Sequence, residues 1–289
     1  MSQLDPLRFI FFGEDVFSLV VLESLVNSNL NLKPLFVVML HPVSTSGQRL
    51  VKYCDDQGIP VLQTKSVRSD EFLTHFDGLR FELIISAHFQ RILPGKLFSK
   101  ARLGGVNLHP SLLPKYRGMS PQHWPIVLGD AETGVTVHLI DEGVDTGNIL
   151  RQESIVLSRD IYIHELQKKL LSVYKTIMVD AVSQLILGDK GCAQPSEGAA
   201  YFDKIKEEDM IINLDAGVDR VYGIIRAFSF PYQGARFENL RIMKAVPVSN
   251  DILIEIKESS ATLGIWRKGK SVYLILVDGV LELTRWNQV

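Results

Sequence analysis

The chain has 289 residues, which is enough for one large domain and a second, smaller one. Hydrophobic residues make up 46% and charged residues 22% of the chain, and the formal net charge of −2 gives no basic footprint for gripping nucleic acid. Its two cysteines, Cys54 and Cys192, have neither disulfide-framework nor metal-ligand spacing, and no apolar run reaches the roughly 18 residues of a membrane helix. We therefore expect a cytoplasmic protein with no metal site and no membrane partner.

The first part of the chain alternates between strand and helix signals. Apolar runs predict strands over 7–13, 34–40, 59–62 and 81–87, and helical spacing predicts helices over 15–26 and 69–76, the second capped by Ser69. Strand, helix and strand at this spacing are typical of right-handed crossover units. This predicts an α/β, Rossmann-like, mostly parallel sheet with helices on both faces. A lone Gly13 after the first strand is not Gly-x-Gly-x-x-Gly, so we exclude nicotinamide binding.

The segment 104–147 holds the polar residues that the fold is expected to bring together. Asn107 and His109 are two apart on a predicted strand, so their side chains point to the same face. Residues 133–140 predict the strand opposite, and Asp145 follows it. An amide stabilises an oxyanion, an imidazole shuttles a proton, and a carboxylate favours the imidazolium. We therefore predict that Asn107, His109 and Asp145 are catalytic when a substrate amine attacks an acyl carbon.

Three neighbouring polar residues receive plainer interpretations. Ser111 is not within Gly-x-Ser-x-Gly, so it is interpreted as a loop residue that hydrogen-bonds nearby backbone. His123 and His138 are interpreted as surface or hydrogen-bonded structural residues.

The C-terminal part of the chain has a different pattern. Residues 160–187 predict a long helix or a broken pair, and 188–200 have the composition of a linker. We therefore expect a catalytic domain over 1–190 and a small β-rich domain over 201–289. After a helix near 216–228, strands are expected over 234–237, 241–245, 252–256, 261–266, 272–277 and 281–284. Many short strands predict an open, barrel-like sheet, whose exposed strands could support a homodimer.

One long, ordered pattern resembles a known family. N-x-H-P-S-L-L-P-x-Y-R-G, then G-V-T-V-H, then D-x-G-x-D-T-G is similar to the formyltransferases that use 10-formyltetrahydrofolate. The resemblance implies that Asn107 polarises the formyl oxygen, that His109 is the acid/base and that Asp145 tunes its imidazole. It also implies 10-formyltetrahydrofolate as the formyl donor, without a metal.

The resemblance further implies which loops hold the two substrates. The pterin ring is expected between two loops, with Phe89, Gln90, Ile92 and Leu93 on one side and Asp141, Gly143 and Val144 on the other. Core packing is the alternative for Phe89, Ile92 and Leu93. The acceptor is expected near Gly13, Glu14, Lys115, Tyr116, Arg117 and Trp124, although Glu14 also suits a plain strand-to-helix turn and Trp124 also suits the core.

The nature of the acceptor is read from two short segments. Loop 41–47 holds no lysine, whereas the resemblance implies a longer loop rich in lysine and glycine in members that act on tRNA. Residues 121–124, Pro-Gln-His-Trp, resemble the sugar-acting members. The leading hypothesis is an N-formyltransferase for a dTDP- or UDP-linked amino sugar, with no nucleic-acid partner. The alternatives are methionyl-tRNA or a small hydroxyornithine-like amine as acceptor, a folate-binding module without turnover, and a hydrolase that releases formate.

Overall fold

The computed structural model describes residues 5–259 and 261–288 and divides the chain into two compact units. Unit 1 comprises the described residues up to 118 together with 134–154 and 170–201, and unit 2 comprises 119–133, 155–169 and the described residues from 202 onward. The expected boundary between 190 and 201 stays a prediction. Two segments that precede it in sequence, 119–133 and 155–169, group with unit 2.

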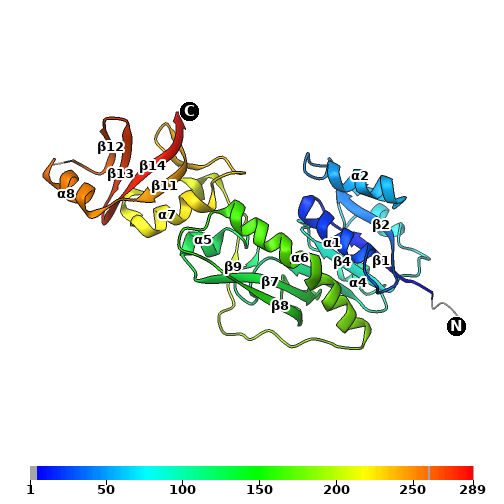
Figure 1. The fold of residues 1–289 in the computed structure, drawn as a ribbon. Helices are drawn as coiled ribbons and strands as arrows, with labels where there is room; N and C mark the ends of the chain where they lie inside the picture. The colour runs from blue at the N-terminus through cyan, green and yellow to red at the C-terminus, as the bar shows by residue number, and fades with distance from the viewer. Residues whose placement is uncertain (1–4, 260, 289) are drawn as a thin grey trace. The chain divides into compact units, whose positions relative to one another are not determined.

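The main sheet has seven strands in the order β3-β2-β1-β4-β5-β7-β8 (Figure 1). The strands are β1 (Leu7–Phe12), β2 (Leu32–Leu40), β3 (Val61–Thr64), β4 (Leu83–Ala87), β5 (Gly105–His109), β7 (Glu132–Leu139) and β8 (Ile149–Val156). Strands β1 to β5 pair in parallel, and β7 runs antiparallel to β5. The predicted mostly parallel α/β sheet is therefore confirmed.

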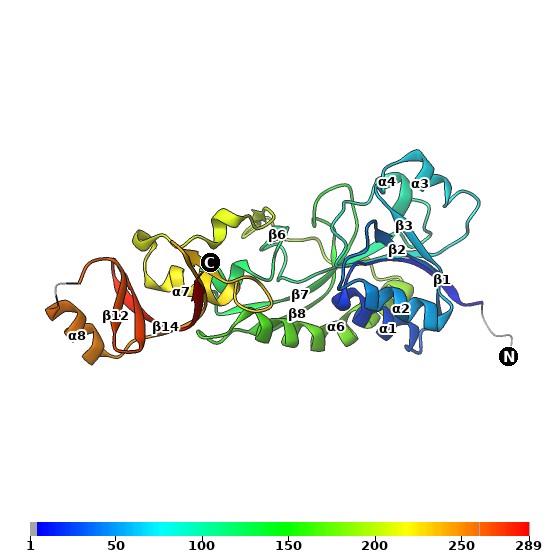
Figure 2. The same ribbon diagram turned by 90° about the horizontal axis from the view of Figure 1, so that it is seen from above.

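Helices cover both faces of this sheet. They are α1 (Val16–Val26), α2 (Gln48–Gln57), α3 (Asp70–Thr74), α4 (Gly95–Phe98) and α6 (Ile163–Ile186). Figure 2 shows α1 and α2 on one face and α3 and α4 on the other. Burial on both faces explains why Phe9, Ile10, Phe11 and Phe12 of β1 are all fully buried, without the polar alternation of a half-exposed strand. Ser69 caps α3 as predicted. Among helices of the described chain, none has the length and apolar character needed to span a bilayer.

Unit 2 contains an open antiparallel sheet in the order β10-β11-β14-β13-β12. Its strands are β10 (Ala235–Phe237), β11 (Leu240–Pro247), β12 (Gly264–Lys268), β13 (Ser271–Leu276) and β14 (Gly279–Gln288). The helices α5 (Trp124–Leu128), α7 (Val218–Ala227) and α8 (Asn250–Glu258) also belong to it. The remaining short elements are β6 (Arg117–Gly118), β9 (Tyr201–Phe202), η1 (Glu207–Met210) and η2 (Leu214–Ala216). The expected small β-rich module is confirmed as an open sheet.

The strand predicted over 252–256 is wrong, because these residues lie in α8. Ile-Leu-Ile-Glu-Ile offers enough apolar residues for a strand, but Ile252, Leu253 and Ile256 also have the spacing of one helical face. All three pack in a cluster that includes residues of β13 and β14. Asp251 in the first turn and Lys257 in the last turn complement the helix dipole. Tertiary packing and charge placement therefore favour the helix.

His123 is a structural residue, as interpreted, but it lies in the core of unit 2 and not at the surface. Its ring is buried in unit 2, stacked on Phe228 at 5.7 Å and edge-on to Tyr232 at 4.7 Å. Neither ring nitrogen has a hydrogen-bond partner among the described residues. Burial disfavours the imidazolium and lowers the pKa of His123 to about 4.

His123 should therefore make the fold sensitive to acid. In the unfolded chain His123 binds a proton near its ordinary pKa of 6.5, whereas in the folded chain it binds one only near pH 4. The free energy of unfolding therefore decreases as the pH falls from about 6.5 to about 4. The loss should reach about 2 kcal/mol at about pH 5. We expect His123→Phe to remove that part of the acid sensitivity, measured by urea unfolding at about pH 7 and about pH 5. Equal acid destabilisation of both proteins would contradict this.

Candidate active site

The register between β5 and β7 places three polar side chains together. Asn107 pairs across the strands with His138, and His109 pairs with Thr136. The Asn107 amide Nδ2 lies 3.2 Å from His138 Nε2. The strand predicted opposite Asn107 is thus confirmed, and it adds an imidazole to the expected amide and imidazole of β5.

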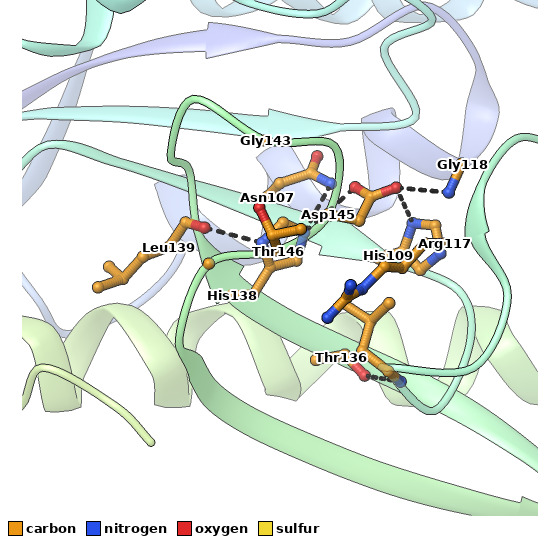
Figure 3. A network of polar contacts seen from close by, with 12 residues as sticks. Asn107, His109, Arg117, Gly118, Thr136, His138, Leu139, Gly143, Asp145 and Thr146 are labelled. Carbon is orange, nitrogen blue, oxygen red and sulfur yellow. Dashed lines mark hydrogen bonds and ion pairs between the residues drawn. The ribbon is translucent and has the colours of Figure 1, made fainter. Parts of the chain in front are cut away.

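The carboxylate of Asp145 lies at the centre of the group (Figure 3). Its Oδ2 is 3.6 Å from His109 Nδ1 and accepts the Gly118 backbone N–H at 2.8 Å, while Oδ1 is 3.4 Å from His138 Nε2. Burial opposes ionisation of this carboxyl, but the imidazoles of His109 and His138 and the Gly118 backbone N–H outweigh burial and hold the pKa of Asp145 below its ordinary value. Asp145 is therefore an ionised carboxylate at neutral pH.

Backbone carbonyls fix which nitrogen of each imidazole carries hydrogen. His109 Nε2 lies 2.8 Å from the Tyr116 carbonyl, and His138 Nδ1 lies 2.8 Å from the Leu139 carbonyl. Because a carbonyl can only accept, those two nitrogens donate. The basic nitrogen of a neutral His109 is then Nδ1, which faces Asp145. Burial is the main cause that lowers the pKa of His109, against the opposing charge of Asp145, so the ring rests as a free base.

The loop after β7 is shaped to present Asp145. The Asp141 carboxylate accepts the Gly143 N–H at 3.1 Å and the Thr146 hydroxyl at 2.7 Å, which closes a tight turn. Asp145 itself has φ of 54°, in the left-handed region. A Cβ at Gly147 would collide with the Leu139 carbonyl, so only glycine lets the chain pass this close. The D-x-G-x-D-T-G spacing thus has a steric cause.

The profile of the formyl transferase family matches residues 30–182, more than half of the chain. The chain belongs to the formyl transferase family. It is 34% identical to a methionyl-tRNA formyltransferase of Kosmotoga olearia over 77% of this chain and 73% of that protein. The resemblance that the sequence motifs carry is therefore confirmed.

Two solved structures share the fold over almost the whole formyltransferase chain. The N-formyltransferase from Helicobacter canadensis, in complex with folinic acid and dTDP-3-aminofucose, has a TM-score of 0.75 at 20% identity and covers 97% of this chain and 100% of its own. WlaRD, a sugar 3N-formyl transferase in the presence of dTDP and 5-N-formyl-THF, has a TM-score of 0.72 at 20% identity, covering 98% and 99%.

The two loops that the sequence predicts to flank a pterin ring lie beside each other. The Glu142 carboxylate, from the loop after β7, lies against Gly95 at the end of the loop after β4. Each loop exposes an apolar side chain, Ile92 at 50% and Val144 at 36%. Asp141 and Gly143 form the turn that precedes Asp145. Both loops therefore have exposed apolar surface, which suits contact with a flat ring.

Other residues expected at the pterin have structural contacts of their own. Leu93 is buried in the core, and Phe89 packs against that core with its ring edge-on to Phe12 at 5.3 Å. Core packing, the alternative interpretation, is confirmed for Leu93. The Gln90 backbone N–H donates to Glu14 Oε2 at 3.1 Å, and burial raises the pKa of Glu14. These contacts join the first loop to the loop after β4.

Three of the residues expected at the acceptor, Gly13, Lys115 and Tyr116, lie in different local environments. Gly13 is buried and its N–H donates to the Val38 carbonyl, so it extends β1. Lys115 is exposed, and the Tyr116 carbonyl holds His109. The Ser111 hydroxyl donates to the Lys115 carbonyl at 2.7 Å, which confirms its interpretation as a loop residue.

Arg117 and Trp124 are engaged by neighbouring side chains. The Arg117 guanidinium donates to Gln194 Oε1 through two nitrogens, at 2.6 and 3.1 Å, and to the Tyr201 hydroxyl at 3.3 Å. Gln194 in turn donates to the carbonyls of Asp145 and Gly147 at 2.8 Å. Trp124 belongs to unit 2 and packs on Phe202 with ring centroids 5.1 Å apart. Arg117 thus braces the Asp145 loop through Gln194.

His138 is hydrogen-bonded, as interpreted, but sequence reasoning did not place it beside Asn107 and Asp145. It is 3% exposed and touches both Asn107 and Asp145. The sequence did contain information on this position. When the predicted strand 133–140 is paired with the Asn107 strand in the observed antiparallel register, His138 lies directly opposite Asn107. Without that register the imidazole has no assigned neighbour.

The two tautomers can be measured directly. We expect two-dimensional ¹⁵N NMR of the folded protein at neutral pH to show His109 with hydrogen on Nε2 and His138 with hydrogen on Nδ1, because each donates to a carbonyl. On acidification His109 should protonate below the pKa of an ordinary imidazole. A His109 hydrogen found on Nδ1 would contradict the arrangement.

Proposed function

We propose that this formyltransferase moves a formyl group from 10-formyltetrahydrofolate to the primary amine of a dTDP- or UDP-linked amino sugar. The observation that carries the proposal is the meeting of an amide, a neutral imidazole and an ionised carboxylate at Asn107, His109 and Asp145. None of these groups needs to act as a nucleophile, because the substrate amine is the nucleophile. Together they suit direct attack by an amine on an acyl carbon.

The side chains divide the work of amine attack between them. His109 Nδ1 accepts the proton that the amine loses as its nitrogen bonds to the formyl carbon, and Asp145 stabilises the imidazolium that results. The Asn107 amide has two hydrogens, of which His138 takes one, and the other can stabilise the oxyanion. When bound, the folate supplies the formyl carbon. The proton held on His109 then passes to the folate nitrogen whose bond to that carbon breaks.

Two observations support a nucleotide-linked amino sugar as the acceptor. The structures from Helicobacter canadensis and of WlaRD share the fold over 97% and 98% of this chain, and they were obtained with dTDP-3-aminofucose and with dTDP. The loop between β2 and α2 is short, and it contains no lysine to contact the phosphates of a tRNA. The cytoplasm remains the proposed location.

Methionyl-tRNA is the second candidate acceptor. The specific observation in its favour is the 34% identity with the methionyl-tRNA formyltransferase of Kosmotoga olearia, higher than the 20% identity with either sugar-acting structure. Both candidates share the same chemistry at the amine. They differ in the phosphate contacts that hold the acceptor.

The catalytic assignment is tested by single substitutions. Asn107→Ala, His109→Ala and Asp145→Ala should each fold and each lower the single-turnover rate by about 10²–10³-fold, because each removes a contact to developing charge. His75→Ala, which removes an exposed imidazole directly after α3, is the matched control and should retain the wild-type rate. A wild-type rate in any of the three would remove that residue from the mechanism.

The acceptor is tested by binding and by product. With folinic acid present, a dTDP- or UDP-linked amino sugar should raise the thermal unfolding temperature more than the same nucleotide without the sugar. Mass spectrometry should then show one added formyl group on the sugar amine when the donor is 10-formyltetrahydrofolate. Affinity for initiator tRNA that falls steeply across a salt series, with formylation of its methionine, would instead establish the second candidate.

A further inference from the structure

The segment 190–201, which follows α6, is attached at both ends to the part of unit 1 that holds the active site. Near its start, the Cys192 backbone exchanges two hydrogen bonds with Ile149, at 2.8 and 2.9 Å. Near its end, the Ala200 carbonyl accepts the Arg117 backbone N–H at 2.9 Å. The segment has the composition of a linker, but its backbone is tied down on either side of the Asp145 loop.

Gln194 lies between these two attachments and uses both ends of its amide. Its Nε2 carries two hydrogens and donates to two backbone carbonyls, those of Asp145 and Gly147, each at 2.8 Å. Its Oε1 accepts two N–H groups of the Arg117 guanidinium, at 2.6 and 3.1 Å. Because a carbonyl can only accept and a guanidinium can only donate, these partners fix the orientation of the amide.

The carbonyl that Gln194 contacts belongs to a residue with an uncommon backbone conformation. Asp145 has φ of 54°, in the left-handed region, which costs free energy for a residue other than glycine and persists where the surroundings enforce it. In this conformation its carboxylate lies 3.6 Å from His109 Nδ1 and 3.4 Å from His138 Nε2. The two hydrogen bonds from Gln194 stabilise the turn that contains this residue.

Asp145 is fixed through its side chain and its backbone from the same short strand, β6. The Gly118 N–H donates to Asp145 Oδ2 at 2.8 Å. The side chain of the preceding residue, Arg117, orients Gln194, which donates to the Asp145 carbonyl. Rotation of the carboxylate away from the imidazoles would therefore break at least one of these hydrogen bonds.

We propose that Gln194 is a positioning residue of the active site, which holds Asp145 in the conformation that directs its carboxylate at His109 and His138. This rests on the proposed function, in which that carboxylate stabilises the imidazolium formed when the amine attacks. Gln194 acts through the backbone of Asp145 and not on the reacting groups. A displacement of a catalytic group by about 1 Å can lower a rate by about 100-fold, so the orientation of this one amide has a measurable effect.

The test compares Gln194→Met with a matched control, Asn148→Ala. Met keeps the length of the side chain and removes its hydrogen bonds. The Asn148 amide donates to the Lys190 carbonyl at 3.0 Å, so its loss loosens the same segment without removing a hydrogen bond to Asp145. The single-turnover rate should fall about 10-fold or more in Gln194→Met and stay at the wild-type value in Asn148→Ala. Equal losses in both variants would overturn the proposal.

A second comparison distinguishes positioning from a general structural role. In an Asp145→Asn background the carboxylate is already absent, so Gln194→Met should slow the enzyme little further. A structural role would lower the rate by the same factor with or without the carboxylate, and that outcome also overturns the proposal. If Gln194→Met does not fold, as judged by thermal unfolding, Gln194→Asn carries the same expectations, because its amide is one methylene too short to reach both partners.

An NMR titration of His109 without substrate separates this proposal from the proposed function. The Asp145 carboxylate favours the charged form of His109, whereas His138 and His88 disfavour it. In Gln194→Met, His109 should therefore protonate at a lower pH than in the wild type. That result in a protein that transfers no formyl group would sustain the positioning role and reject the proposed reaction. An unmoved titration together with a full rate of formyl transfer would reject the positioning role alone.

Discussion

The arrangement of the site depends on one buried carboxylate. Asp145 lies within 3.6 Å of two imidazoles and accepts the Gly118 backbone N–H, and these neighbours hold the pKa of the buried carboxyl below its ordinary value. The same contacts orient His109 and His138, and His138 in turn meets the Asn107 amide. An ionised carboxylate beside a neutral imidazole stabilises the protonated form of that imidazole. Loss of this carboxylate would disturb every other group in the site.

The fold supplies this contact through a change in strand direction. The parallel strands end at one edge of the sheet, as is usual for α/β sites, but β7 returns antiparallel to β5. The chain therefore re-enters the site from the opposite strand end, turns tightly after Asp141 and passes the Leu139 carbonyl at Gly147.

Most of the architecture and the central trio could be predicted, because both rest on local patterns. The apolar run of β1 is explicit in the sequence, and so are the two-residue spacing of Asn107 and His109 and the D-x-G-x-D-T-G turn. The remainder depends on contacts that no local pattern records. His138 needed the register of β5 and β7, and the 252–256 segment was decided by packing in unit 2. The acceptor stays a proposal, because curated relatives and structural neighbours point to different amines.

The central claim, that Asp145 acts through His109, is tested most directly by a double-mutant cycle. Single-turnover rates of Asp145→Asn, His109→Gln and the double variant are compared with the wild type under saturating substrates. If the carboxylate works through the imidazole, the double variant should be little slower than His109→Gln alone, a coupling of about 2 kcal/mol or more. Losses that simply multiply would show two independent contributions and contradict the account.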